Sequence, residues 1–229
     1  MEHISKGLER LNRGNHTAHQ SNIEPATDEI GETREQKLEQ LRRTLGLSSL
    51  VHTFENFKRV AGTETALEAF WAMASDNHKP MLLIYGGVGN GKTFLLEALS
   101  IELYKKGIRC PVYVWSDVMR RFKRGMRRVE SGSTSYDDHF EQFRRQDRLI
   151  IDDVGMGSSG SEWEWGELED IINYRYRERL FTVVATNKDL DELSERVASR
   201  FSDPEVGVIV LNKARDFRRR KVETDERLS

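Results

Sequence analysis

The amino-acid sequence predicts an α/β fold in which a mostly parallel, five-stranded sheet lies between helices. From about residue 54 onward, short apolar segments alternate with helical segments. The apolar segments are nearly continuous rather than alternating, which is typical of strands buried on both faces. A glycine-rich turn joins the first of these strands directly to a helix. These features together favour a sheet that is covered by helices on both faces.

The first expected element is a short amphipathic helix at residues 33–45. Thr33 and Gln36 have the spacing of a capping box, and Gly46 is a typical helix stop. Three leucines fall on one face of this helix, at Leu38, Leu41 and Leu45. Such a face requires an apolar partner, which is either another protein or the chain's own core.

The main domain supplies the remaining elements in alternating order. The expected strands are MLLIY (81–85), PVYVW (111–115), RLIIDDV (148–154), LFTVVAT (180–186) and VGVIVL (206–211). The expected helices cover 63–74, a segment ending at Gly107, a segment begun by Ser116 as its cap, a stretch before 148, 162–179 and 189–201.

The predicted domain organisation is one main domain with a small appendage. We expect a mobile arm at 1–32, because its polar composition provides too little apolar surface to order it. The helical appendage covers 33–50, the main domain 51–221 and a tail 222–229.

Composition excludes several classes of protein. The 36 Lys and Arg residues nearly balance the 38 Asp and Glu residues, so any attraction to nucleic acid must be local. The single cysteine, Cys110, excludes an internal disulfide and a zinc ribbon built on cysteine pairs. No apolar run is long enough to span a bilayer, and the N-terminus lacks an apolar signal core. We therefore expect a cytoplasmic protein without a membrane partner.

The stretch GGVGNGKTF after the first strand predicts a phosphate-binding loop. Gly86, Gly91, Lys92 and Thr93 satisfy the G-x-x-x-x-G-K-[ST] pattern between a strand and a helix. Backbone N–H groups and the helix N-terminus can bind phosphate oxygens, Lys92 can reach the outer phosphates, and Thr93 can bind Mg²⁺. The sequence therefore predicts ATP and Mg²⁺ as cofactors, held by the loop residues Gly86, Gly87, Val88, Gly89, Asn90, Gly91, Lys92, Thr93 and Phe94.

Two later strands end in polar residues that suit the same site. Asp152 and Asp153 close the strand LIIDD, and Asn187 follows VVAT. Asp152 would bind Mg²⁺ and Asp153 would polarise the attacking water. Asn187 would reach the terminal phosphate or the water. Taken alone, the acidic pair is more typical of a turn or a helix cap, and Asn187 is more typical of a turn.

The ordered set of motifs resembles the AAA+ ATPases. It is most similar to the bacterial helicase-loader branch of DnaC- and DnaI-like proteins and to their IstB-type transposition relatives. The resemblance covers about 54–220 and rests on TFENF, GGVGNGKTFLLEAL, LIIDDVG, VVATN, ERVASRF and DFRRR.

The resemblance implies further roles for residues of this chain. Arg200 in ERVASRF matches an arginine finger that acts on the ATP of a neighbouring subunit, with Arg196 as the alternative. It also makes Asn187 the first sensor and Arg218 the second-sensor arginine. Phe54 and Phe57 would flank the adenine or lie in the core. The loader branch resembles this chain in lacking a full C-terminal lid domain.

The acidic pair departs from the usual Asp-Glu of the wider class. Asp153 stands where the longer Glu is common, and a shorter acid holds water less well. We therefore expect slow basal hydrolysis that is stimulated by assembly or DNA.

Two basic runs, at 120–128 and 213–221, predict salt-sensitive contacts with DNA phosphates. The first run would line a groove for single-stranded DNA in an assembled spiral of subunits, with Phe122 able to stack on a base. A solvated helix face is the alternative for either run. The expected DNA contacts are Arg120, Arg121, Lys123, Arg124, Arg127 and Arg128.

Three functions are compatible with these patterns. The leading one is a helicase loader, which binds a hexameric replicative DNA helicase and places it on single-stranded DNA. The second is an IstB-like ATPase that assists a transposase on duplex DNA. The third is a small-molecule kinase, in which VVATN and ERVASRF have no obvious place. The first two require self-association into an ATP-bridged oligomer, whereas a kinase does not.

Overall fold

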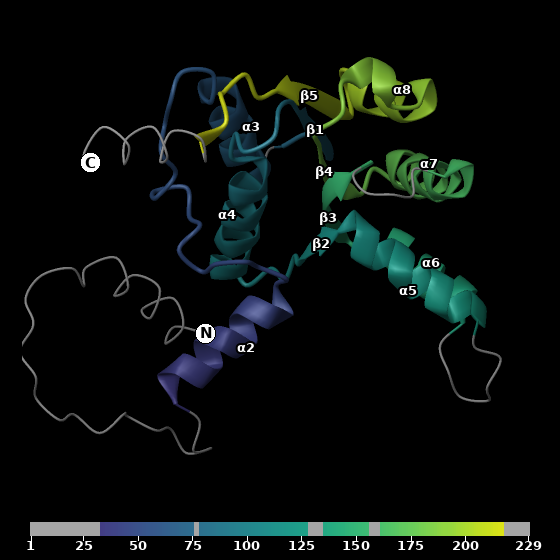
Figure 1. Cartoon of the computed structure of the whole chain (residues 1–229), viewed down its shortest axis with the longest axis horizontal. Helices are drawn as coiled ribbons and strands as arrows, with labels where there is room; N and C mark the ends of the chain where they lie inside the picture. Colours follow the sequence, from purple (N-terminus) through teal and green to yellow (C-terminus); the bar gives the residue numbers. More distant parts are fainter. Residues whose placement is uncertain (1–32, 76–77, 128–134, 156–160, 218–229) are drawn as a thin grey trace, which may run out of the picture.

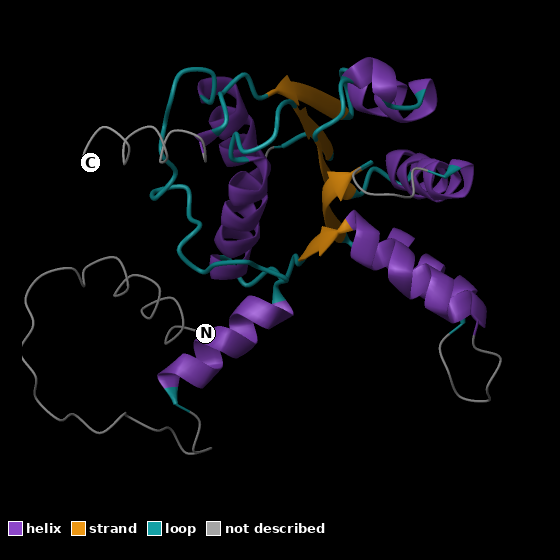
Figure 2. Cartoon of the chain, viewed as in Figure 1, coloured by secondary structure: helices purple, strands orange, loops and turns teal. Residues whose placement is uncertain are grey.

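The computed structural model describes residues 33–75, 78–127, 135–155 and 161–217. These residues form one five-stranded parallel sheet in the order β2-β3-β4-β1-β5, with helices on both faces (Figures 1 and 2). The predicted fold class is confirmed. Within the described part of the chain, no helix is long and apolar enough to cross a membrane.

The five strands and the helices alternate along the chain as the sequence predicts. The strands are β1 Met81–Tyr85, β2 Val112–Val114, β3 Arg148–Val154, β4 Phe181–Thr186 and β5 Gly207–Leu211. The helices are α2 Arg34–Thr44, α3 Glu64–Ala74, α4 Lys92–Lys105, α5 Trp115–Arg127, α6 Tyr136–Arg144, α7 Glu162–Arg177, the 3-10 turn Leu190–Glu192 and α8 Glu195–Ser202.

Each face of the sheet has its own apolar core. In β1, Leu82 and Ile84 point into a core shared with α3 and α4, whereas Met81 and Leu83 point into a core shared with α5 to α8. Because side chains alternate along a strand, an apolar run such as MLLIY can serve both cores at once. This double burial explains why the strands read as continuous apolar segments.

Helix α2 begins and ends as its sequence predicts. The Thr33 side chain accepts a hydrogen bond from the backbone of Gln36, whose side chain accepts one from the Thr33 backbone. Gly46 follows the helix with a φ of 64°, a conformation that favours glycine. Leu45 is buried in the core beside α4, and Leu41 packs against that core. The C-terminal end of α2 therefore docks on its own domain, while the rest projects from it (Figure 1).

Ser116 does not cap the helix that it was expected to begin. Helix α5 starts one residue earlier, at Trp115, directly after β2. Trp115 is buried in the core that the sheet shares with α5 to α8. Its apolar side chain therefore packs from the first residue of α5 and not from the end of a longer β2. Ser116 consequently lies in the first turn of α5.

Candidate nucleotide-binding site

The predicted phosphate loop, the acidic pair and Asn187 lie together at the carboxyl edge of the sheet. Strand β4 lies between β1 and β3, so the loop after β1 and the acids at the end of β3 flank the end of β4. In open parallel sheets this edge is the usual place for a ligand.

The loop after β1 has the backbone of a phosphate cradle. Gly86, Gly89 and Gly91 all have positive φ, and Gly91 is the N-cap of α4 with no side-chain cap. A Cβ on Gly91 would lie 3.0 Å from the ring of Phe57. A larger residue here would therefore crowd that ring and would also be strained by the positive φ. The first N–H groups of α4 therefore remain available to an anion.

Lys92 is buried and its ammonium is held by the loop itself. Its Nζ donates to the carbonyl oxygens of Gly86 at 2.8 Å and Gly87 at 2.7 Å, and to Oδ1 of Asn90 at 3.1 Å. Burial lowers the Lys92 pKa to about 8, and the negative charges of Asp152 and Asp153 oppose that shift. The cation can therefore exchange carbonyl partners for phosphate oxygens with little movement of the loop.

Thr93 and Asp152 form a pair of oxygen ligands at the base of the loop. The Thr93 hydroxyl donates to Oδ2 of Asp152 at 2.7 Å, and Asp152 is only 3% exposed. Burial raises the Asp152 pKa to about 6, against the effect of the Thr93 hydrogen bond, and the Asp153 charge raises it further. Mg²⁺ prefers oxygen ligands and retains positions for water and phosphate. The pair fits the predicted metal site.

Asp153 has an unusual backbone that the sequence does not reveal. Its φ is 54°, and its N–H donates to Oδ1 of Asp152 at 2.8 Å. The register between β3 and β4 shifts between Ile151 and Val154, so the two acids lie at a bulge. Bulges and positive φ values occur where a strand must redirect a side chain, often beside active sites.

Asn187 lies beside Asp153, as the sequence predicts. Its Nδ2 donates to Oδ1 of Asp153 at 3.1 Å. The preceding Thr186 fixes this end of β4, because its hydroxyl donates to the Val154 carbonyl at 2.7 Å and accepts from the Lys188 N–H. The acid and the amide therefore lie side by side at the ends of adjacent strands.

Arg200 does not reach the site of its own chain. Its Nε donates to Oδ1 of Asn173 on α7 at 2.9 Å, and its guanidinium lies 4.8 Å from the ring centre of Tyr176. Arg196, on the same helix, is 77% exposed and lies 3.4 Å from Glu169. The two arginines thus differ in environment, because Arg200 of α8 packs against α7 whereas Arg196 is largely exposed.

Some basic side chains of α5 are exposed without a carboxylate partner among the described residues, and others form ion pairs within the chain. Arg121 and Arg124 are exposed, and Arg120 pairs with Asp117 of the same helix. Lys123 pairs with the buried Glu164 of α7 at 2.8 Å, which neutralises its charge. The Arg127 side chain, and the whole of Arg128 and Arg218, lie outside the described residues.

The expectation that Phe122 stacks on a base is wrong. Phe122 is 2% exposed and packs against the rings of Tyr136, Phe140 and Phe143. It joins α5 to α6 and leaves no ring face for a ligand.

Phe54 and Phe57 belong to the core, which was one of their two expected places. Both are buried in the cluster beside α3 and α4. Phe57 also contacts the edge of Phe94, at 5.4 Å between ring centres. Phe94 itself, predicted as a loop residue, packs against this core and stacks near His52 at 4.3 Å.

Two connections to the loop and its helix were missed by sequence reasoning. The Glu97 carboxylate of α4 accepts hydrogen bonds from residues 48–52, and Asn90 pairs with Asn212. Both join residues far apart in sequence, so no local pattern could have indicated them.

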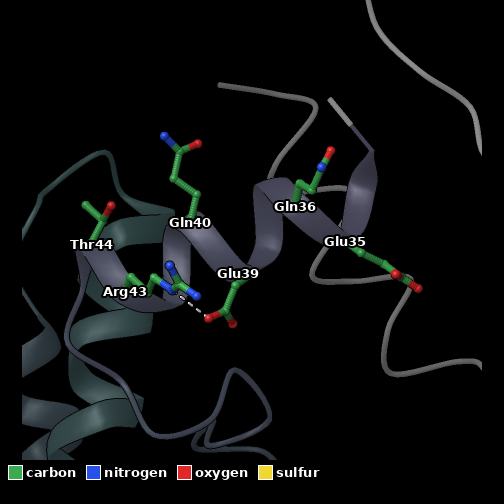
Figure 3. Close-up of a pocket in the computed structure, with 6 residues that line it drawn as sticks. All are labelled: Glu35, Gln36, Glu39, Gln40, Arg43 and Thr44. Carbon is green, nitrogen blue, oxygen red and sulfur yellow. Dashed lines mark hydrogen bonds and ion pairs between the residues drawn. The ribbon is translucent and has the colours of Figure 1, made fainter. Parts of the chain in front are cut away.

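A hollow along α2 is separate from this site. All the residues that line it come from this one helix, and an ion pair joins two of them, Glu39 and Arg43 (Figure 3). Its lining contains no glycine. The lining residues are Glu35, Gln36, Glu39, Gln40, Arg43 and Thr44.

Comparison with known proteins identifies the family. Residues 49–210 match the family model described as the bacterial DnaA ATPase domain. The chain belongs to this family. This result confirms the AAA+ assignment and the ATPase class, whereas the narrower loader assignment stays a prediction.

Similar curated proteins include chromosomal replication initiators. DnaA of Citrifermentans bemidjiense is 32% identical over 157 residues, which cover 66% of this chain and 33% of that protein. DnaA of Limosilactobacillus fermentum is 29% identical over 162 residues, covering 66% of this chain and 34% of that protein. The DnaA-family chain therefore spans about a third of these relatives.

Solved structures show the same fold. AMPPCP-bound DnaA from Aquifex aeolicus has 26% identity and a TM-score of 0.60, covering 76% of this chain and 54% of that one. The structure of the DnaC helicase loader has 23% identity and a TM-score of 0.59, covering 71% of this chain and 97% of that one. The likeness to DnaC is a likeness of fold alone.

Proposed function

We propose that this DnaA-family chain is a replication ATPase that forms an ATP-bridged oligomer on single-stranded DNA and there delivers a hexameric replicative helicase. The observation that carries the proposal is the division of the site. The loop, Thr93–Asp152 and Asp153–Asn187 meet at one edge of the sheet, while Arg200 contacts α7 instead. A complete site would then need the arginine of a neighbouring subunit.

Each residue has a defined task in the proposed hydrolysis. Lys92 exchanges its carbonyl partners for phosphate oxygens, and Thr93 with Asp152 would bind Mg²⁺. When bound, Mg²⁺ neutralises charge on the phosphates. Asp153 polarises the attacking water and takes up its proton, while Asn187 holds the Asp153 carboxylate and orients the water.

The DNA part of the proposal rests on the exposed arginines of α5. Arg121 and Arg124 lie on the solvent side, free of the internal pair that neutralises Lys123. One solved structure with 27% identity is DnaA bound to AMPPCP and single-stranded DNA. We expect salt-sensitive binding that weakens in Arg121→Ala and Arg124→Ala but changes little in Lys123→Ala.

A DnaA-type initiator is the second candidate, favoured by the family match over residues 49–210. It would share the ATP-bridged assembly on DNA but would not require a helicase complex. The projecting part of α2 is the proposed contact with the helicase, because only its C-terminal end docks on the core. An IstB-like role would instead favour ATP-dependent filaments on duplex DNA.

The first test mixes the protein with the replicative helicase of its own source, with and without ATP, on a size-exclusion column. A variant lacking residues 1–44 keeps Leu45 and the core and serves as the comparison. A complex that is lost on deletion supports helicase delivery through α2. No complex, with retained ATP-dependent binding to single-stranded DNA, supports the initiator-type function instead.

A second test addresses the shared site. Arg200→Ala should bind ATP like the parent but hydrolyse it at least tenfold more slowly, and Arg196→Ala is the matched control on the same helix. Mixing Arg200→Ala with a Lys92→Ala variant should restore activity, because each supplies the group that the other lacks. No restoration by mixing would contradict a finger that acts between subunits.

A further inference from the structure

Asn90 of the phosphate loop and Asn212 after β5 form a reciprocal pair. Nδ2 of Asn90 donates to the Asn212 carbonyl at 2.9 Å, and Nδ2 of Asn212 donates to the Asn90 carbonyl at 3.0 Å. Both side chains are buried, with exposures of 4% and 1%. Each buried side-chain amide donates to the backbone carbonyl of the other residue. These two bonds fix the relative position of two segments that are 122 residues apart.

The pair belongs to a longer chain of hydrogen bonds that ends at Lys92. Oδ1 of Asn90 accepts from the Lys92 ammonium at 3.1 Å, and Oδ1 of Asn212 accepts from the Ala214 N–H at 3.2 Å. The phosphate-binding cation is therefore connected through two amides to the backbone that leaves the last strand.

Two close backbone contacts bring the same segments together. A Cβ on Gly86 would lie 2.5 Å from the Asn212 carbonyl oxygen, so the loop can approach Asn212 only with a glycine there. Farther along, the Phe217 N–H donates to the Gly89 carbonyl at 2.9 Å. Residues 212–217 thus follow the loop from its first glycine to its middle.

We propose that Asn212 is a positioning residue for the nucleotide site, which holds the phosphate loop in its binding conformation through Asn90 and couples that loop to residues 212–217. The inference rests on the proposed nucleotide role of the loop and extends it to a residue outside the motif. A loop with three positive-φ glycines is costly to order, so fixing its shape before the ligand arrives improves affinity.

The coupling has a direct physical reason. When Lys92 turns toward a phosphate, the Asn90 side chain loses that partner but keeps its bonds to Asn212. The loop then has no need to reorganise, and any shift that does occur is transmitted to the Ala214 and Phe217 backbone through the same bonds. Nucleotide binding should therefore protect residues 212–217 as well as the loop.

The test uses Asn212→Asp, which matches the size of the parent side chain. It keeps the acceptor for the Ala214 N–H but replaces the donor to the Asn90 carbonyl by a second acceptor. A buried group deprived of its partner commonly costs enough to weaken binding on the order of tenfold. We expect that loss in the affinity for a fluorescent ATP analogue, measured by titration with Mg²⁺ present.

The control is Asn56→Asp. Asn56 also donates from its side-chain amide to a backbone carbonyl, that of Val51 at 3.0 Å, but it is exposed and outside the loop. Its variant should bind the analogue within about twofold of the parent. Hydrogen exchange provides the second measurement: the analogue should slow exchange at 212–217 in the parent and in Asn56→Asp, but not in Asn212→Asp.

The proposal would be overturned if Asn212→Asp bound the ATP analogue as tightly as the parent does. It would also be overturned if the analogue did not change the rate of hydrogen exchange at 212–217 in the parent. If Asn212→Asp does not fold, Asn90→Ala removes the other bond of the pair, from Nδ2 of Asn90 to the Asn212 carbonyl, and must also reduce the protection at 212–217. If the parent binds no ATP, the proposed function fails on its own. The pair is then tested without nucleotide, where Asn212→Asp must still accelerate exchange at residues 86–91.

Discussion

Glu97 offers a sharp test of what supports the helix of the phosphate loop. Its carboxylate lies on α4, is 2% exposed, and accepts from the Ser48 N–H at 2.7 Å and the Ser49 N–H at 3.3 Å. Nδ1 of His52 lies 2.7 Å away and must carry a hydrogen toward this acceptor. We predict that Glu97→Gln destabilises the chain, although glutamine has nearly the same shape.

The size of the effect follows from these contacts. Glutamine keeps one carbonyl oxygen but replaces the other by an NH₂ group, so at least one of the three donors meets another donor. An unsatisfied buried donor costs about 1–3 kcal/mol, and the remaining bonds lose about 1 kcal/mol of charge assistance. The sum is about 2–4 kcal/mol, a large part of the roughly 5–15 kcal/mol that stabilises a typical domain.

Urea denaturation measures this change, with Glu102→Gln as the control. Glu102 lies on the same helix but is more exposed and pairs with Lys105 at 2.9 Å, so the same substitution there should cost less than about 0.5 kcal/mol. Equal slopes of the unfolding free energy against urea would establish that only stability changed. A difference between the two variants of less than about 1 kcal/mol would refute the assigned support.

The effect of Glu97→Gln should also depend on pH. Burial alone would raise the Glu97 pKa, but hydrogen bonds from His52 and Ser48 outweigh it and hold that pKa below the ordinary 4.5. A carboxylate with a lowered pKa stabilises the fold above its unfolded value, and the contribution disappears as pH falls through the folded value. The difference between parent and Glu97→Gln should be full at pH 7 and shrink below about pH 4.5.

Two further predictions concern the core. Arg175 is fully buried and donates to the Thr182 hydroxyl and to the carbonyls of Arg144, Gln146 and Phe181. Arg175→Met should therefore lower the free energy of unfolding, measured by urea denaturation, by about 3 kcal/mol or more. A decrease of less than about 1 kcal/mol would contradict this role. Burial raises the Cys110 pKa to about 12, so a thiol reagent should label the folded chain at least a thousandfold more slowly than the urea-unfolded chain. Because the unfolded thiol ionises near pH 9 and the folded one near 12, stability should fall more steeply between these pH values in the parent than in Cys110→Ala.

The elements could be predicted from local patterns because each pattern has a local cause. The capping of Thr33 depends on Gln36, three residues away, and the continuous apolar run MLLIY is itself the mark of a strand buried on both faces. The two errors arose where one apolar residue fits either interpretation. Trp115 was assigned to a strand but packs from α5, and Phe122 was assigned to DNA although Val118, Met119 and Phe122 form a helical apolar face in the second core.

The site was predicted as a set of residues but not as a geometry. Motif spacing and strand ends are enough to bring Lys92, Asp152 and Asn187 to one edge of a parallel sheet. The positive φ of Asp153 depends on the register shift between β3 and β4, which is a property of the paired strands. The place of Arg200 depends on Asn173, a residue of another helix with no motif of its own.

The support of the phosphate loop comes from both ends of the described chain. Residues 48–52 attach to α4 through Glu97, and residues 212–217 attach to the loop through Asn90 and Gly89. The first attachment fixes the helix whose N-terminus receives phosphate, while the second fixes the loop that precedes it. Because Lys92 stands where the two meet, its position depends on segments that the motif does not contain. A phosphate loop grafted from this chain without those segments would keep its glycines and lose its shape.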